Sequence, residues 1–382
     1  MCLDPIRFEL LSKEQDLVFN LPLTGQYLVV GPPGTGKSVV ALHRAGRVAK
    51  SGTNVDLVIL TKSKLLKEWT KESSRDLKID LDSVRTYHSW AYGWHRSTFN
   101  RGIPHFATSS YDYDWKEIKK SLASSKFVKT LNIIIDEGQD LPSEFYEVLP
   151  LIAKSITVFA DENQTLGAQN STLNQIQHGL GVSDQQVLKL TKNYRNCRDI
   201  AELSAQFYTG LSTGIPELPE KKCASGKPTV NKFRNRIQQA KYISDWQKNN
   251  PTKKIGIFLP TAPSRDAFYN LFVELESPVQ MYHGKTDVDE LELCDPGIFL
   301  TWFDNSKGLE FDHVFIPALE DWNPNIGQSE EEKIAALRML YVLTSRAKEQ
   351  LHLMWAPDEN GREPVVAKLL PPQFIDEVGD KK

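Results

Sequence analysis

The chain is poor in the features that would place it in several protein classes. It has only four cysteines, far apart and without a C-x-x-C pair: Cys2, Cys197, Cys223 and Cys294. This spacing indicates neither a zinc site nor a disulfide framework, so we expect reduced thiols in a cytoplasmic protein. No apolar run approaches the roughly 20 residues that a membrane span needs, and residues 1–11 carry acidic side chains where a signal peptide is apolar.

An excess of basic residues is also lacking. The formal net charge is −3, so total charge gives no sign of a nucleic-acid partner, although a protein that grips a strand in a local groove would not need one. Hydrophobic residues make up 40% and charged residues 25%, which is typical of a soluble globular protein. A length of 382 residues favours two domains.

Short apolar runs alternate with helical patterns along the sequence. The predicted buried strands are Tyr27–Val30, Val55–Leu60, Asn132–Ile135, Ile156–Ala160, Ile255–Leu259, Gly297–Leu300, His313–Ile316 and Gln350–Met354. The predicted helices include Leu65–Glu72, Glu144–Leu149, Arg265–Glu276 and Glu331–Leu343. We therefore expect two α/β domains, 1–185 and 186–382, with the polar, glycine-containing segment 179–186 at their boundary.

The strongest motif is a phosphate-binding loop that follows the first predicted strand. The pattern G-x-x-x-x-G-K-[ST] is met in full by Gly31, Pro32, Pro33, Gly34, Thr35, Gly36, Lys37 and Ser38. Glycines let successive backbone N–H groups point at a polyphosphate, and the helix that follows adds its partial positive charge. Lys37 would reach the β- and γ-phosphates and Ser38 would hold Mg²⁺. The alternative is a ligand-free glycine-rich turn.

An acidic segment about a hundred residues later completes the predicted hydrolase site. The strand Asn132–Ile135 runs directly into Asp136 and Glu137. Asp136 can hold Mg²⁺ through water beside the phosphate loop, and Glu137 can polarise the attacking water. A solvated acidic turn is the alternative, but it does not account for the matching loop upstream. We therefore predict hydrolysis of a nucleoside triphosphate.

These two motifs together resemble the motor core of superfamily 1 helicases of the UvrD/Rep type, and further motifs follow in the family's order between about residues 11 and 353. The matching segments are Leu11–Gln15, Asp161–Gln164, Asn193–Asn196, Lys307–Phe311 and Leu340–Lys348. The resemblance implies two tandem RecA-like P-loop NTPase domains, with parallel sheets flanked by helices and an ATP cleft between them. It also implies ATP and Mg²⁺ as ligands.

The same resemblance assigns nucleotide contacts residue by residue. Gln15 would read adenine, and Tyr194 would stack on it. Gln164 and Arg195 would contact the γ-phosphate. Glu310 would lie at the ribose or phosphates, and Arg346 would be an arginine finger, which stabilises transition-state charge.

The nucleic-acid side matches the family less completely. Thr86, Tyr87 and His88 resemble its strand-contacting T-[FY]-H-S element, and we add Lys64 and Trp302 as candidate contacts. Thr61, however, stands where the family carries a stacking phenylalanine, and Asp304 replaces a strand-contacting histidine. The segment 165–170 also departs from the family's aromatic run.

The accessory insertions of the family are reduced to a short segment at about 93–131. Its aromatic residues favour a small strand-binding cap, a partner surface or simply a packed loop.

Two functions of the whole chain remain open. The first is an ATP-driven motor on single-stranded nucleic acid, by resemblance DNA. The alternative is an ATP-driven switch subunit that regulates a partner, such as a nuclease in DNA repair or antiviral (phage) defence. A small-molecule kinase would leave residues 193–196 and 340–348 unexplained.

Overall fold

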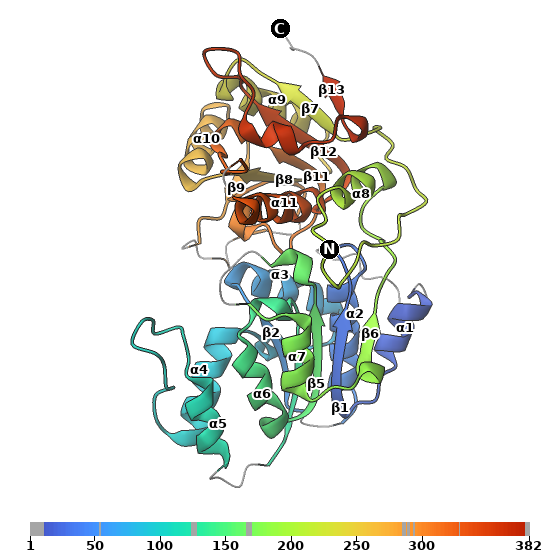
Figure 1. The fold of residues 1–382 in the computed structure, drawn as a ribbon, viewed down its shortest axis with the longest axis vertical. Coiled ribbons are helices and arrows are strands. Elements are labelled where there is room, and N and C mark those ends of the chain that lie inside the picture. The colour runs from blue at the N-terminus through green and yellow to red at the C-terminus, as the bar shows by residue number, and fades with distance from the viewer. Residues whose placement is uncertain are drawn as a thin grey trace. The chain divides into compact units, whose positions relative to one another are not determined.

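The computed structural model describes residues 11–52, 55–123, 128–165, 170–284, 288, 291–292, 295–327 and 329–378. The chain divides into two compact units, which Figure 1 colours from blue to green and from green to red. Unit 1 comprises Met1–Pro32 and Gly36–Thr191, and unit 2 comprises Pro33–Thr35 and Lys192–Lys382.

Unit 1 is a parallel sheet covered by helices. Its strands are β1 (Gly25–Val30), β2 (Leu57–Thr61), β3 (Val84–Thr86), β4 (Leu131–Ile135), β5 (Ala153–Ala160) and β6 (Val187–Lys189). Its helices are α1 (Lys13–Phe19), α2 (Lys37–Ala49), α3 (Lys64–Ser74), α4 (Tyr87–Phe99), α5 (Trp115–Ala123), α6 (Ser143–Ile152) and α7 (Leu173–Leu180). The sheet order is β3-β2-β4-β5-β1-β6.

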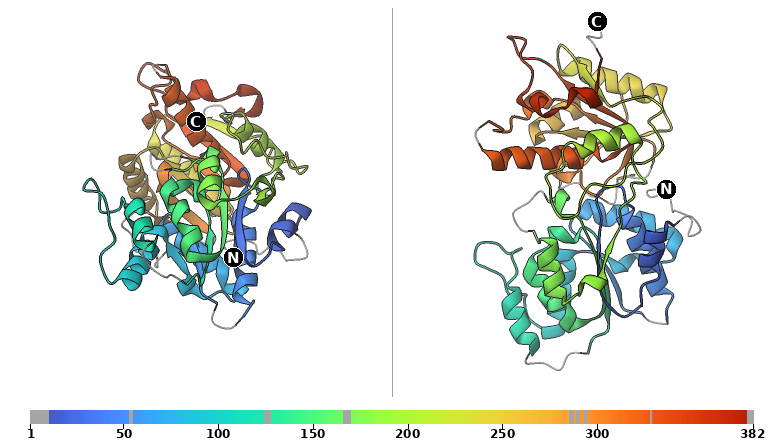
Figure 2. Two further views of the ribbon diagram at one scale, coloured as in Figure 1. Left: turned by 60° about the horizontal axis from the view of Figure 1, so that its bottom comes forward. Right: turned by 45° about the vertical axis from the view of Figure 1, so that its right-hand side comes forward.

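The central strands of this sheet are buried along most of their length, as Leu28–Val30, Ile133–Ile135 and Ile156–Ala160 show. Such continuous burial is expected when helices cover both faces of a parallel sheet, as they do here (Figure 2). Parallel pairing also brings the carboxyl ends of β1, β4 and β5 to one edge. Ligands of open α/β sheets bind at that edge, so it is where a site is expected.

Unit 2 repeats this architecture. Its strands are β7 (Thr229–Lys232), β8 (Lys254–Leu259), β9 (Val279–Met281), β10 (Gly297–Trp302), β11 (Phe311–Ile316), β12 (Ala347–Trp355) and β13 (Asp376–Val378). Its helices are α8 (Arg198–Ala205), α9 (Arg236–Asn249), α10 (Ala262–Glu274) and α11 (Glu330–Thr344). The sheet order is β13-β7-β12-β11-β8-β10-β9. In the part of the chain that the structure describes, no helix is long and apolar enough to cross a membrane.

The predicted strands and helices all overlap observed elements, which confirms the α/β fold class. The strands that were not predicted are short and lie at or near sheet edges: β3, β6, β7, β9 and β13. Because β6 pairs with β1, the first sheet continues past residue 185, where we placed the domain boundary.

The expectation of unpaired thiols is wrong for two of the cysteines. Cys197 and Cys223 form a disulfide, with their Cα atoms 5.0 Å apart. The backbone N–H of Arg198 donates to the Lys221 carbonyl oxygen, and the N–H of Cys223 donates to Asp199, both at 2.8 Å. These contacts align two segments whose separation of 26 residues gave no signal in the sequence. Cys2 and Cys294 lie outside the described residues.

Candidate ATP site and nucleic-acid interface

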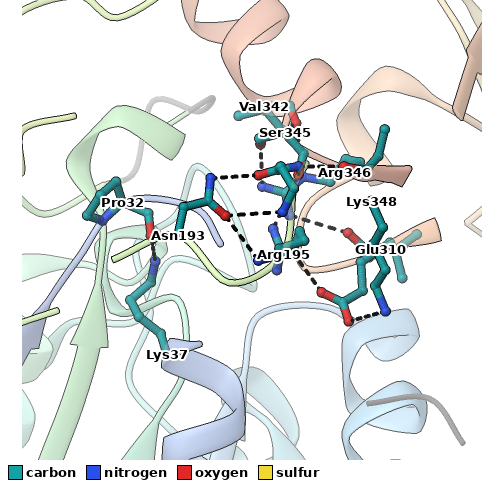
Figure 3. Close-up of polar contacts among 12 residues, drawn as sticks. Pro32, Lys37, Asn193, Arg195, Glu310, Val342, Ser345, Arg346 and Lys348 are labelled. Carbon is teal, nitrogen blue, oxygen red and sulfur yellow. Dashed lines mark hydrogen bonds and ion pairs between the residues drawn. The ribbon is translucent and has the colours of Figure 1, made fainter. Parts of the chain in front are cut away.

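The phosphate loop joins β1 to α2 and is folded around the ammonium group of Lys37. Gly34 and Gly36 have φ angles of +82° and +83°, a region that side chains with a Cβ rarely adopt. The Lys37 Nζ donates to the carbonyl oxygens of Gly31 at 2.6 Å and Pro32 at 3.2 Å (Figure 3). The loop therefore directs a buried cation and the start of α2 toward one position, as binding of a polyphosphate requires.

Gln15 lies against this loop. It belongs to α1, where its side chain and Ser12 cap the helix reciprocally. A Cβ added to Gly36 would come within 2.5 Å of the Gln15 Nε2 atom, so the buried amide of Gln15 and the loop backbone are in close approach. The structure thus brings Gln15 to the phosphate loop, and its contact with adenine stays a prediction.

Asp136 follows β4 and faces the same loop. Its carboxylate accepts a hydrogen bond from the Ser38 hydroxyl and another from the backbone N–H of Glu137, the latter at 3.1 Å. Burial and the neighbouring Glu137 raise the pKa of Asp136 to about 6, against the opposing effects of Ser38 and Lys37. The proposed metal ligands Ser38 and Asp136 are therefore in contact, around a buried negative charge that its neighbours compensate only in part.

Glu137 adopts an unusual backbone conformation, with φ at +55°. A non-glycine residue in this region is uncommon, and such residues concentrate at functional sites. Its Oε2 accepts a hydrogen bond from Gln139 Nε2 at 2.7 Å. The Oε1 of Gln139 in turn accepts the backbone N–H of Asp161 at 2.9 Å, so one buried amide connects the ends of β4 and β5.

The segment after β5 adds a second buried carboxylate. Asp161 accepts hydrogen bonds from the Gln164 side chain at 2.9 Å and from the backbone N–H of Asn163 at 3.1 Å. Burial raises the pKa of Asp161, while Lys37 and the Gln164 hydrogen bond oppose that rise. Our sequence reasoning assigned a role to Gln164 but missed Asp161 and Gln139, because their function is to orient neighbours. Residues 166–169, part of the departing segment, lie outside the described residues.

In unit 2, Arg195 and Glu310 form an ion pair, which Figure 3 shows. The Arg195 Nε donates to Glu310 Oε2 at 2.7 Å, and the Lys348 Nζ lies 3.0 Å from Glu310 Oε1. Burial would raise the pKa of Glu310, but the two cations outweigh it and lower that pKa to about 2. Glu310 is thus a structural counter-ion of Arg195 and Lys348, a contact that the sequence did not predict.

Arg346, the predicted arginine finger, is only 1% exposed. Its Nε donates to the Val342 carbonyl oxygen at 2.9 Å and its Nη2 to the Ser345 hydroxyl at 3.1 Å (Figure 3). These bonds hold the guanidinium at the end of α11. Tyr194, the predicted adenine platform, is 43% exposed, and the Lys192 ammonium lies 5.8 Å from its ring centroid.

The residues of the predicted nucleic-acid element have different environments. Thr86 caps α4, since its hydroxyl accepts the Ser89 N–H at 3.3 Å. Tyr87 is only 2% exposed, and its hydroxyl accepts the indole N–H of Trp115 at 2.7 Å. Tyr87 therefore packs in the core of unit 1, and its contact with a strand stays a prediction. His88 is half-buried at the surface of the same helix.

The other candidates belong to different units. Lys64 is exposed at the start of α3 in unit 1. Trp302 ends β10 in unit 2, where the Arg265 guanidinium lies 5.5 Å from its ring centroid. Thr61 is buried and Asp304 is exposed. Among the predicted contacts of unit 1, Lys64 is thus exposed and Thr86 and His88 are half-buried, whereas Tyr87 is buried.

Comparison with known proteins supports the helicase-like interpretation. The sequence profile of an AAA domain matches residues 18–169, which include the phosphate loop and both acidic segments. A predicted ATP-dependent DNA helicase of Acanthamoeba polyphaga mimivirus is 25% identical over 252 residues. That match covers 61% of this chain and 35% of the relative, so the chain spans about a third of the relative's length.

The architecture is also found in a solved structure of Saccharomyces cerevisiae Dbp5 bound to RNA and ADP BeF3. The two share 11% sequence identity with a TM-score of 0.51, over 96% of this chain and 89% of the other. At that identity the likeness shows the fold alone, which is the RecA-like α/β fold.

Proposed function

We propose that this superfamily 1 helicase-like protein, a P-loop NTPase with ATP hydrolase chemistry, uses ATP hydrolysis to move along single-stranded DNA. The observation that carries the proposal is the arrangement at the carboxyl edge of the first sheet. Lys37, Asp136 and Glu137 come from different parts of the chain and meet around one phosphate loop. A loop that only binds a nucleotide would not need Glu137, whose backbone has the uncommon φ of +55°.

The residues present fit a magnesium ion. Mg²⁺ prefers hard oxygen ligands and usually takes one or two from the protein and the rest from water and phosphate. Ser38 and Asp136 supply two such oxygens in mutual contact, and the raised pKa of Asp136 marks negative charge that a divalent cation would compensate. Across the described residues, no cluster of three or more His, Cys, Asp or Glu side chains could hold a metal. When bound, the ion would neutralise phosphate charge.

Glu137 is the proposed general base. Its carboxylate is buried, and Gln139 holds one oxygen in place by donating a hydrogen bond at 2.7 Å. Fixing the carboxylate beside the loop lets it orient a water for in-line attack on the γ-phosphorus and accept the proton that the water releases. Gln164 is held by Asp161 in the same unit, as a sensor of the γ-phosphate would need to be.

In the second unit, we propose roles for two arginines, one tyrosine and the glutamate that pairs with one of the arginines. Arg195 and Arg346 remain our candidates for stabilising transition-state charge, and Tyr194 for stacking on adenine. Glu310 is better explained as the residue that orients Arg195 than as a direct ribose contact, because both of its oxygens are engaged by cations. A carboxylate that bridges two cations in this way, one through each oxygen, restricts the orientation of the arginine.

DNA is the proposed track because the sequence relative is a predicted DNA helicase, whereas the structural neighbour was solved with RNA. One observation favours the switch subunit as a second candidate. Thr61 is buried and an exposed carboxylate occupies position 304, so two contacts expected of a strand-gripping motor are absent at those described positions.

The test is the ATPase rate of the purified chain alone and with single-stranded DNA, single-stranded RNA or duplex DNA. We expect single-stranded DNA to raise kcat severalfold. Lys37→Ala should lower kcat by about 100-fold or more, and Glu137→Gln should keep ATP binding while losing hydrolysis. An ATPase rate that none of the three nucleic acids changes would refute the motor and favour the partner-driven switch.

A further inference from the structure

The short segment between α4 and α5 forms a defined hairpin, which Figure 1 shows in teal. The backbone N–H of Phe106 donates to the Asp112 carbonyl oxygen and that of Asp114 to the Pro104 carbonyl oxygen, both at 2.9 Å. His105 and Tyr113 form an antiparallel bridge within it. The hairpin is therefore an ordered support rather than a loose connection.

The aromatic residues of this region divide into a buried and an exposed set. Trp94, Tyr113 and Trp115 are buried and pack into the core of unit 1. Tyr92, Phe106 and Tyr111 are, by contrast, among the few large apolar side chains at the surface of the described chain, with 46%, 48% and 66% exposure. The buried set explains why the hairpin folds, but it does not explain the exposed set.

Three exposed or half-buried rings lie on neighbouring parts of α4 and the hairpin, and we call them the aromatic strip: His88, Tyr92 and Tyr111. His88 and Tyr92 are four residues apart on α4 and so lie on the same face of the helix. The ring centroid of Tyr111 lies 5.3 Å from that of His88, and the centroid of Tyr113 lies 5.5 Å from it. The Tyr113 hydroxyl donates to the His88 carbonyl oxygen at 3.3 Å, which fixes the buried ring beneath the strip.

The imidazole of His88 is held as a neutral ring. Burial, together with the charge of Lys62, lowers the pKa of His88 to about 4, so the ring is neutral at physiological pH. Among the described residues, its Nδ1 has no hydrogen-bond partner. A neutral ring that is packed against tyrosines and partly open to solvent is suited to stacking rather than to ion pairing.

The strip lies at the edge of the sheet where the ATP site is built. Register pairs Thr86, the last residue of β3, with Thr61 of β2, and pairs Leu60 with Ile135, the residue before Asp136. The start of α4 is thus level with the proposed catalytic carboxylates and two strand spacings, about 10 Å, from their strand. Ligands of parallel α/β sheets bind along this edge.

We propose that His88, Tyr92 and Tyr111 form a base-stacking platform for single-stranded nucleic acid, built by the hairpin of unit 1. The proposal rests on the proposed function and adds residues to it: Tyr92 was not a predicted contact, and Tyr111 belongs to the segment for which the sequence left a strand-binding cap, a partner surface and a packed loop open. Every base has a π-face, so the platform binds strands with little sequence preference. Its surroundings carry both Lys62 and Asp112, so the platform contributes stacking rather than neutralisation of phosphates.

The test is the affinity of the full chain for a fluorescein-labelled 20-nucleotide oligothymidylate, measured by anisotropy. A stacked base contributes enough that Tyr111→Ala should weaken binding by about 5-fold to 100-fold. Tyr111→Phe keeps the ring and should bind within about twofold of wild type. Because no phosphate contact is lost, the slope of log affinity against log salt should be the same in Tyr111→Ala and wild type.

An abasic oligonucleotide of the same length tests whether the Tyr111 ring stacks on bases. Because this strand has no bases, Tyr111→Ala and wild type should bind it with nearly the same affinity. Equal unfolding temperatures of the two proteins would show that the hairpin is intact, as the exposure of Tyr111 leads us to expect. If wild type binds the strand and Tyr111→Ala binds equally well, the platform is wrong while the motor stands. If wild type binds no strand at all, both proposals fail.

Discussion

Replacing Asp136 by asparagine should stabilise the protein while abolishing its activity. The carboxyl of Asp136 is 5% exposed, and its pKa rises from the ordinary 3.8 to about 6, through burial and the charge of Glu137. A raised carboxyl pKa means that the ionised form is disfavoured in the folded state. The folded protein therefore loses stability as the pH rises through about 6, and regains it as the pH falls from 6 toward 4.

The size of this effect follows from the pKa difference. About two pH units, at 1.36 kcal/mol each, give about 3 kcal/mol of destabilisation above pH 7. Asparagine is nearly isosteric and its carbonyl oxygen can still accept the Glu137 N–H, so it removes the charge with little change in packing. In a domain of this size, 1 kcal/mol shifts Tm by about 2–4 °C, which predicts a rise in the Tm of unit 1 by about 6 °C or more at pH 8.

Differential scanning calorimetry at pH 8 and pH 4.5 is the assay, because it can separate the transitions of two domains. The Tm gain of Asp136→Asn should be largest at pH 8 and fall to about a third of that at pH 4.5, where the folded wild-type carboxyl is protonated but the unfolded one is still mostly ionised. Asp76→Asn, at an exposed position, is the matched control and should leave Tm unchanged at both values. A variant that melts at or below the wild-type temperature at pH 8 would refute the claim that this carboxylate is an uncompensated buried charge.

The remaining predictions concern unit 2. Glu310 has a pKa lowered to about 2, so it stabilises the fold above its ordinary value of 4.5, and that stability is lost as the pH falls toward 2. Glu310→Gln should cost about 3 kcal/mol at pH 7 and flatten the acid limb of a Tm-against-pH plot. An unchanged acid limb would contradict the ion-pair account. Reduction of the Cys197–Cys223 disulfide by dithiothreitol should destabilise wild type by about 2–4 kcal/mol in urea titrations. Dithiothreitol should leave the stability of Cys197→Ser unchanged. A loss of stability in that variant would argue against the disulfide.

The fold was predictable where local and long-range signals agree. Strands such as Ile133–Ile135 are apolar throughout because both faces are covered, and that burial is written into the sequence. Short edge strands such as β3 and β13 are not, because three residues carry too little periodicity and their pairing depends on the neighbour that they meet. The disulfide was missed for a related reason, since Cys197 and Cys223 approach through backbone contacts of their flanking segments.

The same distinction runs through the candidate site. A phosphate loop is a local device, so Lys37 and Ser38 could be assigned from spacing alone, and Asp136 and Glu137 from a strand that ends in acids. The orientation of a side chain, by contrast, depends on the partner that it contacts. Nothing in the sequence says that Gln139 holds Glu137, or that Glu310 engages Arg195 across 115 positions.

A motif on the nucleic-acid side does not tell which side of a helix each of its residues occupies. Tyr87 and His88 are adjacent in one motif, yet α4 turns the first into the core and the second toward solvent. The hairpin then sets Tyr111 beside His88, from a segment that no motif covers. A surface that binds a strand without sequence preference needs rings in the right place rather than a conserved order of letters, so the fold, more than the motif, decides which aromatic residues of unit 1 can meet a base.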